Sequence, residues 1–258
     1  MTKQVAYLLA CLTILIQAVA VAQGQQKPAD YLTSDFHRAK REELRRLMPP
    51  NSVAVFFSNA IRSRANDGFY KYHQDPNFYY LTGHREPHGV LFVFKDMQRF
   101  ENVETNELIF VRAHDALKEL YDGARLGKEG AVENLKFKVA YEGPEFEKFN
   151  LDFSRFDKVM FYDFFNDVRN TDEPGDLFDL IEQFKQKVGY DQGKLNVALE
   201  PKKNNIDLVS LDALMKKLRG IKSPEEIALL RKAVNISTVG QLEVMKAIKP
   251  GMSEMQIH

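Results

Sequence analysis

Short runs of apolar residues, each of strand length, recur between polar segments in the middle of this 258-residue chain. Continuous apolar runs are typical of strands that are covered on both faces of a sheet. The pattern predicts strands at residues 53–57, 78–81, 89–94, 107–111, 138–141 and 158–162. The charged tract at residues 95–107 is expected to be a hairpin-like or irregular connection.

Amphipathic segments alternate with these runs. Apolar residues recur at helical spacing after Asp176, and residues 223–226 (Ser-Pro-Glu-Glu) combine a cap, a first-turn proline and two acidic side chains. We expect helices from Ser34 or Asp35 to about Met48, at residues 144–149, 208–218 and 224–248, from Asp176 onward, and from about residue 254. The alternation predicts an α/β fold, a layered mixed sheet with helices on both faces.

Residues 1–22 differ from the rest of the chain. Lys3 is their only charged side chain, residues 5–22 are nearly all apolar, and residues 20–22 have a small-x-small sequence. This predicts a cleaved signal peptide and a secreted or periplasmic protein. An uncleaved membrane anchor and a lipoprotein signal ending at Cys11 remain alternatives. Cys11 is the only cysteine, so the mature chain has no disulfide or thiolate metal site.

The charge balance excludes one class of partner. Lys plus Arg and Asp plus Glu number 36 each, which gives a formal net charge of zero. The chain therefore has no excess of basic residues, and we expect no nucleic-acid partner. A hydrophobic content of 44% is enough for a sizeable core.

Residues 62–94 combine turn signals with clustered aromatic side chains. Residues 66–68 (Asn-Asp-Gly) and 75–77 (Asp-Pro-Asn) are turn sequences, and Tyr70 and Tyr72 alternate across a short extended piece between them. The run N-D-x-x-Y-x-Y-H-Q-D-P-N-F-Y-Y-L-T-G-H-x-E-P, at residues 66–87, resembles the N-terminal domain of the aminopeptidase P (Xaa-Pro aminopeptidase) family.

Two later segments extend this resemblance. Residues 119–127 resemble a second block of the family, with Tyr121 where the family usually has Trp. A later segment, in its two stretches at residues 222–233 and 249–254, resembles the opening of the catalytic pita-bread domain. After the signal peptide predicted at 1–22, the resemblance implies a creatinase/aminopeptidase P N-terminal domain at 23–205, and a linker with the first helices of a truncated pita-bread α+β domain at 206–258. Because residue 258 falls inside a helix that has barely started, we expect a truncation rather than a natural end.

The resemblance also implies a function. The chain is expected to be the N-terminal portion of an exported Xaa-Pro aminopeptidase, a metallopeptidase that releases an N-terminal residue before proline. The family holds two metal ions, expected to be Mn²⁺, with two Asp, one His and two Glu of its catalytic half. No catalytic residue and no metal ligand is assigned in this chain, which is expected to be inactive alone.

The implied partners are peptides with proline at the second position, the chain's own catalytic domain and further copies in a homo-oligomer. The N-terminal domain of the family narrows access to the metal site. The substrate-access residues that we expect at this entrance are Asp67, Tyr70, Tyr72, Gln74 and Tyr79. A prolidase or creatinase relative, and a non-catalytic binding domain of the pita-bread type, remain alternatives.

Two further segments carry metal-ligand residue types. His84 and His88 flank Glu86 at zinc-helix spacing, but Pro87 removes an amide donor, so we expect a polar loop. An acidic segment lacks the oxygen spacing and glycine of a calcium loop, so we expect a solvated turn there. Its residues are Asp167, Asp172, Glu173 and Asp176.

Overall fold

The computed structural model describes residues 31–66, 68–164, 171, 173–190 and 205–257. It divides the chain into a unit of residues 1–31 and a unit of residues 32–258. The predicted signal peptide at residues 1–22 lies outside the described residues. None of the described helices is both long enough and apolar enough to cross a membrane.

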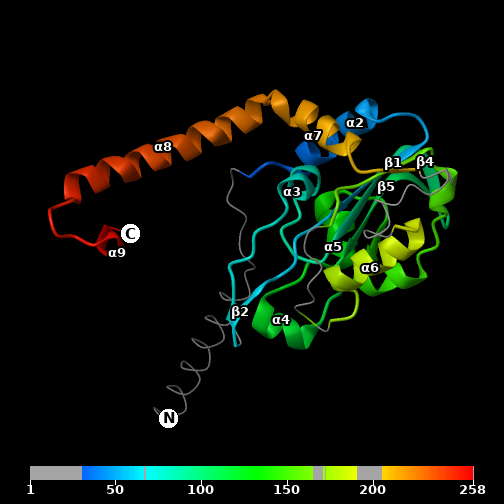
Figure 1. The fold of residues 1–258 in the computed structure, drawn as a ribbon, viewed down its shortest axis with the longest axis horizontal. Helices are drawn as coiled ribbons and strands as arrows, with labels where there is room; N and C mark the ends of the chain where they lie inside the picture. The colour runs from blue at the N-terminus through cyan, green and yellow to red at the C-terminus, as the bar shows by residue number, and fades with distance from the viewer. Residues whose placement is uncertain (1–30, 67, 165–170, 172, 191–204, 258) are drawn as a thin grey trace, which may run out of the picture. The chain divides into compact units, whose positions relative to one another are not determined.

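A six-stranded mixed sheet forms the centre of this unit, in the order β6-β5-β4-β1-β7-β8 (Figure 1). The central strand β1 runs antiparallel to β4 and parallel to β7, and the pairs β5–β6 and β7–β8 are also parallel. The strands are β1 (Ser52–Phe57), β4 (Val90–Phe100), β5 (Val103–Val111), β6 (Ala140–Glu142), β7 (Lys158–Met160) and β8 (Ile206–Asp207). A separate small ribbon pairs β2 (Ser63–Ala65) with β3 (Gly68–Phe69).

Helices cover both faces of the sheet, as the alternation predicted. On one face lie α6 (Leu177–Val188) and the 3₁₀ helices η1 (Gly143–Lys148) and η2 (Phe153–Arg155). On the other face lie α2 (Ser34–Leu47), α3 (Pro76–Thr82), α5 (Gly127–Leu135) and α7 (Ser210–Gly220). The predicted layered α/β fold is therefore confirmed.

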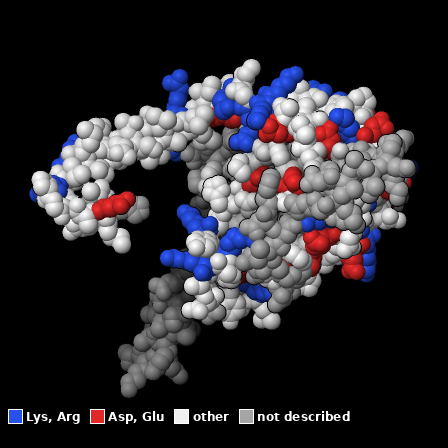
Figure 2. Space-filling model, viewed as in Figure 1, with Lys and Arg blue, Asp and Glu red and all other residues white. Residues whose placement is uncertain are grey.

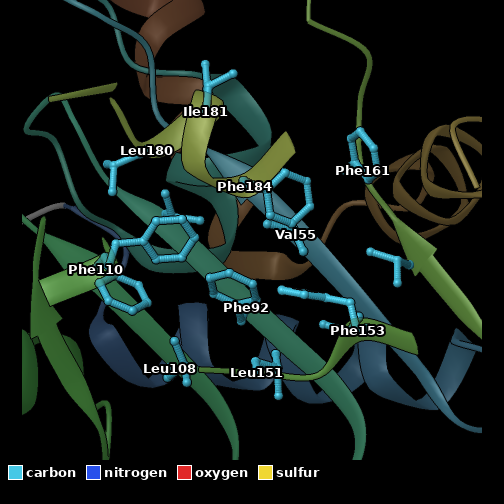
Figure 3. Packing of buried hydrophobic residues seen from close by; sticks show 14 of the residues in the cluster. Val55, Phe92, Leu108, Phe110, Leu151, Phe153, Phe161, Leu180, Ile181 and Phe184 are labelled. Atoms are coloured by element: carbon cyan, nitrogen blue, oxygen red, sulfur yellow. The ribbon is translucent and has the colours of Figure 1, made fainter. Parts of the chain in front are cut away.

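Aromatic side chains fill the core between the sheet and α6. The ring of Phe92 lies 6.1 Å from that of Phe110 and 6.5 Å from that of Phe184, which also meets Phe161 edge-on at 5.0 Å (Figure 3). All four side chains are buried. Each buried Phe stabilises the fold by roughly 1.5–3 kcal/mol relative to an exposed one. This core therefore holds the sheet firmly, and the loops that follow its strands extend from a fixed edge.

The predicted strand at residues 78–81 is wrong, because these residues form α3. The Asp75 carboxylate accepts hydrogen bonds from the amides of Asn77 (2.9 Å) and Phe78 (2.8 Å) and caps the helix, with Pro76 in its first turn. Gly83, at φ 70°, ends it. A short apolar run fits a buried helical turn as well as a strand, and here the cap decides between them.

The other predicted elements are confirmed in part. The tract at 95–107 continues β4 and β5 into a long hairpin, so the hairpin alternative is confirmed. Thr33, rather than Ser34 or Asp35, caps α2, and the helix predicted at 144–149 is the 3₁₀ helix η1. The prediction missed α4 (Ala116–Asp122) and α5.

The segment after residue 205 contributes to the same sheet and core. β8 pairs with β7, and Leu211, Met215 and Leu218 of α7 are buried against the sheet. The helix α8 (Pro224–Ala247) begins with the predicted Ser223 cap, and α9 (Glu254–Ile257) follows it. The domain boundary at 205/206 stays a prediction, and the residues on both sides of it pack together.

Candidate functional site

The side chain of Gln74 joins three segments of the chain. Its Oε1 accepts hydrogen bonds from the amides of Asn59 (3.1 Å) and Asp75 (2.8 Å). Its Nε2 donates to the carbonyls of Glu86 (2.8 Å) and His84 (3.3 Å). An amide side chain has two donors and two acceptor lone pairs, so Gln74 uses its full capacity to hold the segments after β1, before α3 and after α3 together.

Tyr72 reinforces the same junction. Its hydroxyl lies 3.2 Å from the carbonyl oxygen of Asn59 and 3.3 Å from that of Glu86. Burial raises the pKa of Tyr72 well above its usual value, so the phenol stays protonated and can donate. The Asn59 side chain in turn donates to the carbonyl of His73 at 2.8 Å. Gln74, Tyr72 and Asn59 therefore form a polar clasp that fixes three loop segments at one edge of the sheet.

Two hollows border this clasp, and both include Asn59, Ala60 and Arg62 in their linings. The smaller, of about 290 Å³, continues along Tyr70, Lys71, Tyr72 and His73. The larger, of about 390 Å³, lies at the carboxyl ends of β1 and β7. Crevices at the carboxyl ends of parallel strands are the usual ligand position in open α/β sheets, so this edge is the best candidate for contact with a substrate.

The larger hollow has a polar and an apolar wall. The polar wall includes Asp75, Asn77 and Tyr162, and the apolar wall includes Leu177 and Ile181. Burial raises the pKa of Asp75, against the opposing effect of the two amides that it caps. The side-chain amide of Asn77 donates to the Tyr162 hydroxyl at 3.0 Å, so the polar wall is itself held by hydrogen bonds.

The structure brings three of the five predicted access residues together. Tyr72 and Gln74 belong to the clasp, and Tyr70, which is 59% exposed, lines the smaller hollow. Tyr79 lies elsewhere, with its ring 5.6 Å from that of His37 on α2. Asp67 lies outside the described residues. Contact of any of them with a substrate stays a prediction.

A second polar network, which sequence reasoning missed, joins the two resembling blocks. The Glu86 carboxylate accepts a hydrogen bond from the amide of Leu126 at 2.8 Å. Arg125, 4% exposed, pairs with Glu173 (2.5 Å) and Asp122 (3.4 Å). Both blocks were recognised in the sequence, but their contact depends on the β4–β5 hairpin that separates them.

This network corrects one prediction about the acidic segment. Glu173 is not solvated, because it is ion-paired with Arg125, and Asp176 is 1% exposed and accepts from the Asp179 amide at 2.9 Å as the cap of α6. Asp167 and Asp172 lie outside the described residues. A solvated turn was the wrong interpretation for the two residues that can be placed.

The polar loop predicted at residues 84–88 connects α3 to β4. In it His88 Nδ1 accepts from the Leu177 amide at 2.9 Å, and burial lowers the pKa of His88 to about 4. Within the described ranges, no three His, Cys, Asp or Glu side chains lie close enough together to hold a metal ion.

Comparison with known proteins identifies what this unit resembles. Residues 37–158 match the family model described as "Aminopeptidase P, N-terminal domain". The Xaa-Pro aminopeptidase of Haemophilus influenzae is 30% identical over 81% of this chain and 42% of its own length. That of Escherichia coli is 28% identical over 86% of this chain and 46% of its own length.

The fold is similar to a solved member of the same group. Aminopeptidase P from E. coli with the inhibitor Pro-Leu has a TM-score of 0.66 and 25% identity, covering 88% of this chain and 47% of that chain. The chain thus spans a little less than half the length of the relatives that it matches.

Proposed function

We propose, from the premise that this chain carries the N-terminal domain of the aminopeptidase P family, that it is the N-terminal portion of an exported Xaa-Pro aminopeptidase. Its role there is to shape access to a catalytic centre held by the rest of the enzyme. The substrates are peptides with proline at the second position. The composition of residues 1–22 supports the export, and the names of the relatives support the activity.

The clasp around Gln74 is the observation that carries the access role. It holds the loops at residues 59–62, 70–75 and 84–86 in one fixed arrangement beside two hollows. A rim that must select peptides by size needs loops that do not yield to a larger substrate, and a fully satisfied polar network supplies such rigidity. Tyr70, with a broad apolar ring and a polar edge, suits the exposed side of such a rim.

The chemistry of peptide-bond cleavage belongs to the catalytic part in this proposal. There, two metal ions, expected to be Mn²⁺, would supply a water activated for attack on the peptide bond. The residues of this chain exclude peptides that are too wide for the entrance and orient those that enter. They bound the entrance and limit the width of the approaching peptide.

Two exposed apolar surfaces support packing against the catalytic part and against further copies. Helix α4 has no buried residue and exposes Leu117, Leu120 and Tyr121. Helix α8 also has no buried residue. Its exposed apolar side chains are Ile227, Leu230, Val234, Ile236, Val239, Leu242 and Met245. Contiguous exposed apolar surface is typical of an interaction site, so a homo-oligomer with several domain contacts is the expected assembly.

The test compares two forms of the protein on two substrates. The full-length enzyme is predicted to cleave the tripeptide Xaa-Pro-Yaa in the presence of Mn²⁺, and the 258-residue chain alone is predicted to leave it intact. Cleavage of the dipeptide Xaa-Pro in preference to the tripeptide would favour the prolidase alternative. Binding of peptides by a full-length protein that cleaves neither substrate would favour a non-catalytic binding domain.

A further inference from the structure

A strongly basic hollow lies on the side of the unit formed by α2, the β4–β5 hairpin and the segment after α5. Its volume is about 590 Å³. Its charged lining consists of Arg38, Arg45, Arg46, Lys95, Lys136 and Lys138, with Glu42 and Glu107 as the acidic residues. Six cations against two carboxylates leave a surplus of four positive charges, in a chain whose formal net charge is zero. Figure 2 shows Lys and Arg side chains, with Asp and Glu among them, at the end of the unit where α2 and α7 lie.

The carboxylate at the floor of the hollow is already neutralised. Glu107, 6% exposed, accepts from Arg41 Nε (3.0 Å) and Nη2 (2.9 Å) and from Arg45 Nη1 (2.6 Å). These arginines lower the pKa of Glu107 against the opposing effect of its burial, so it stays ionised. Arg41, Arg45 and Glu107 together carry two positive charges and one negative charge. Their surplus positive charge is costly to bury unless an anion compensates it.

The rim adds cations that have no acidic partner. Among the described residues, no carboxylate lies within ion-pair distance of Arg46, Lys136 or Lys138. The negative end of the α2 dipole explains basic residues in its last turn, and Lys95 Nζ donates there to the Arg45 carbonyl at 2.8 Å. The dipole does not explain Lys136 and Lys138, which lie in the segment after α5.

We propose that this hollow binds an anion that carries two or more phosphate groups. Guanidinium and ammonium groups are the donors that phosphate oxygens prefer, and Arg presents several of them in a fixed fork. The volume falls in the range of about 300–1,000 Å³ that is typical of small-molecule sites and exceeds what a single phosphate fills. None of the described residues that line the hollow is aromatic, so these residues offer no stacking platform for nucleic-acid bases.

The test measures binding of sodium triphosphate to the chain by calorimetry at low ionic strength. The Lys136→Ala/Lys138→Ala variant is predicted to weaken binding by about tenfold. The matched control is Lys216→Ala/Lys217→Ala on α7, which removes the same charge at an exposed site outside the hollow and is predicted to change the affinity less than twofold. Thermal unfolding of each variant verifies that it is folded.

A second arm identifies the source of the phosphate groups. Vesicles of phosphatidylcholine with phosphatidylglycerol, and with cardiolipin in place of phosphatidylglycerol, are tested by co-sedimentation with the same variants. Binding of triphosphate alone assigns a free anion, and binding of cardiolipin vesicles that depends on Lys136 and Lys138 assigns a lipid headgroup. The proposal is overturned if neither probe binds, or if the α7 control weakens binding as much as the hollow variant does.

Discussion

The guanidinium of Arg41 on α2 forms a bidentate ion pair with the carboxylate of Glu107 on β5, with Nε–Oε2 at 3.0 Å and Nη2–Oε1 at 2.9 Å. Arg41 is fully buried, and its remaining donor Nη1 reaches the carbonyl of Leu81 at the end of α3, at 2.7 Å. Its guanidinium also stacks over the ring of Phe137 at 4.1 Å. One side chain therefore ties α2 to the sheet and to the helix that follows the clasp.

Removal of this arginine is predicted to be strongly destabilising. Arg41→Met should lower the free energy of unfolding by about 3–5 kcal/mol, because Glu107 loses two of its three hydrogen bonds and the Leu81 carbonyl loses its donor. Arg38→Met on the exposed face of the same helix should change it by less than about 0.5 kcal/mol. Urea unfolding of the two variants measures both effects, and equal losses would show that the pair contributes no more than a surface charge.

The buried His88 predicts a decline of stability with acid. Burial lowers its pKa to about 4 in the folded state, whereas the unfolded chain takes up the proton near pH 6.5. Stability is therefore fully present above pH 6.5 and falls as the pH drops towards 4, by up to roughly 3 kcal/mol for this one group. Unfolding followed across this range by circular dichroism gives the slope.

A conservative variant separates His88 from other titrating groups. His88→Asn retains an acceptor for the Leu177 amide and a residue that tolerates the positive φ of 61° at this position. It should flatten the profile between pH 6.5 and 4, whereas His73→Gln, at an exposed histidine, should leave the slope as it is. A slope that persists in His88→Asn would place its origin in another residue.

The cap of α3 tests why the apolar run at residues 78–81 is helical. Asp75→Ala removes the acceptor for two amides and should cost about 0.5–2 kcal/mol, and Asp75→Asn should cost less because its oxygen still accepts. Chemical unfolding of the two variants gives the difference. If Asp75→Ala were as stable as Asp75→Asn, tertiary packing alone would hold the helix.

The sequence contains enough information for the layered architecture but not for every element. The unbroken apolar run at residues 53–57 identified β1, and the Ser223 cap identified the start of α8, because each signal is local. Residues 78–81 misled, since four apolar residues suit a helical turn or a strand and the Asp75-Pro76 cap was interpreted as a turn. The apolar run alone does not separate the two structures, and the Asp75 cap decides between them.

The site could be predicted only as far as it is contiguous in the chain. Tyr70, Tyr72 and Gln74 lie within five residues of one another, and the structure brings them to the same edge. The carbonyl groups of Asn59 and Glu86 were not identified as partners of Gln74 and Tyr72, because a main-chain carbonyl is the same in every residue type. The contact of Glu86 with Leu126 joins residues 40 positions apart in the chain, and no local pattern marks the two as partners.

The central proposal is that a rigid rim on this unit controls which peptides reach a catalytic centre held by the rest of a Xaa-Pro aminopeptidase. The most direct measurement is the ratio of kcat/KM for a long Xaa-Pro peptide to that for a tripeptide, in the full-length enzyme with Gln74→Ala. This change frees the three loops that Gln74 joins, so that the rim yields to a larger substrate. The ratio is therefore predicted to rise by about tenfold. Gln186→Ala, at an exposed glutamine of α6, should leave it within twofold of the unmodified enzyme. A folded Gln74→Ala enzyme with an unchanged ratio would contradict the claim.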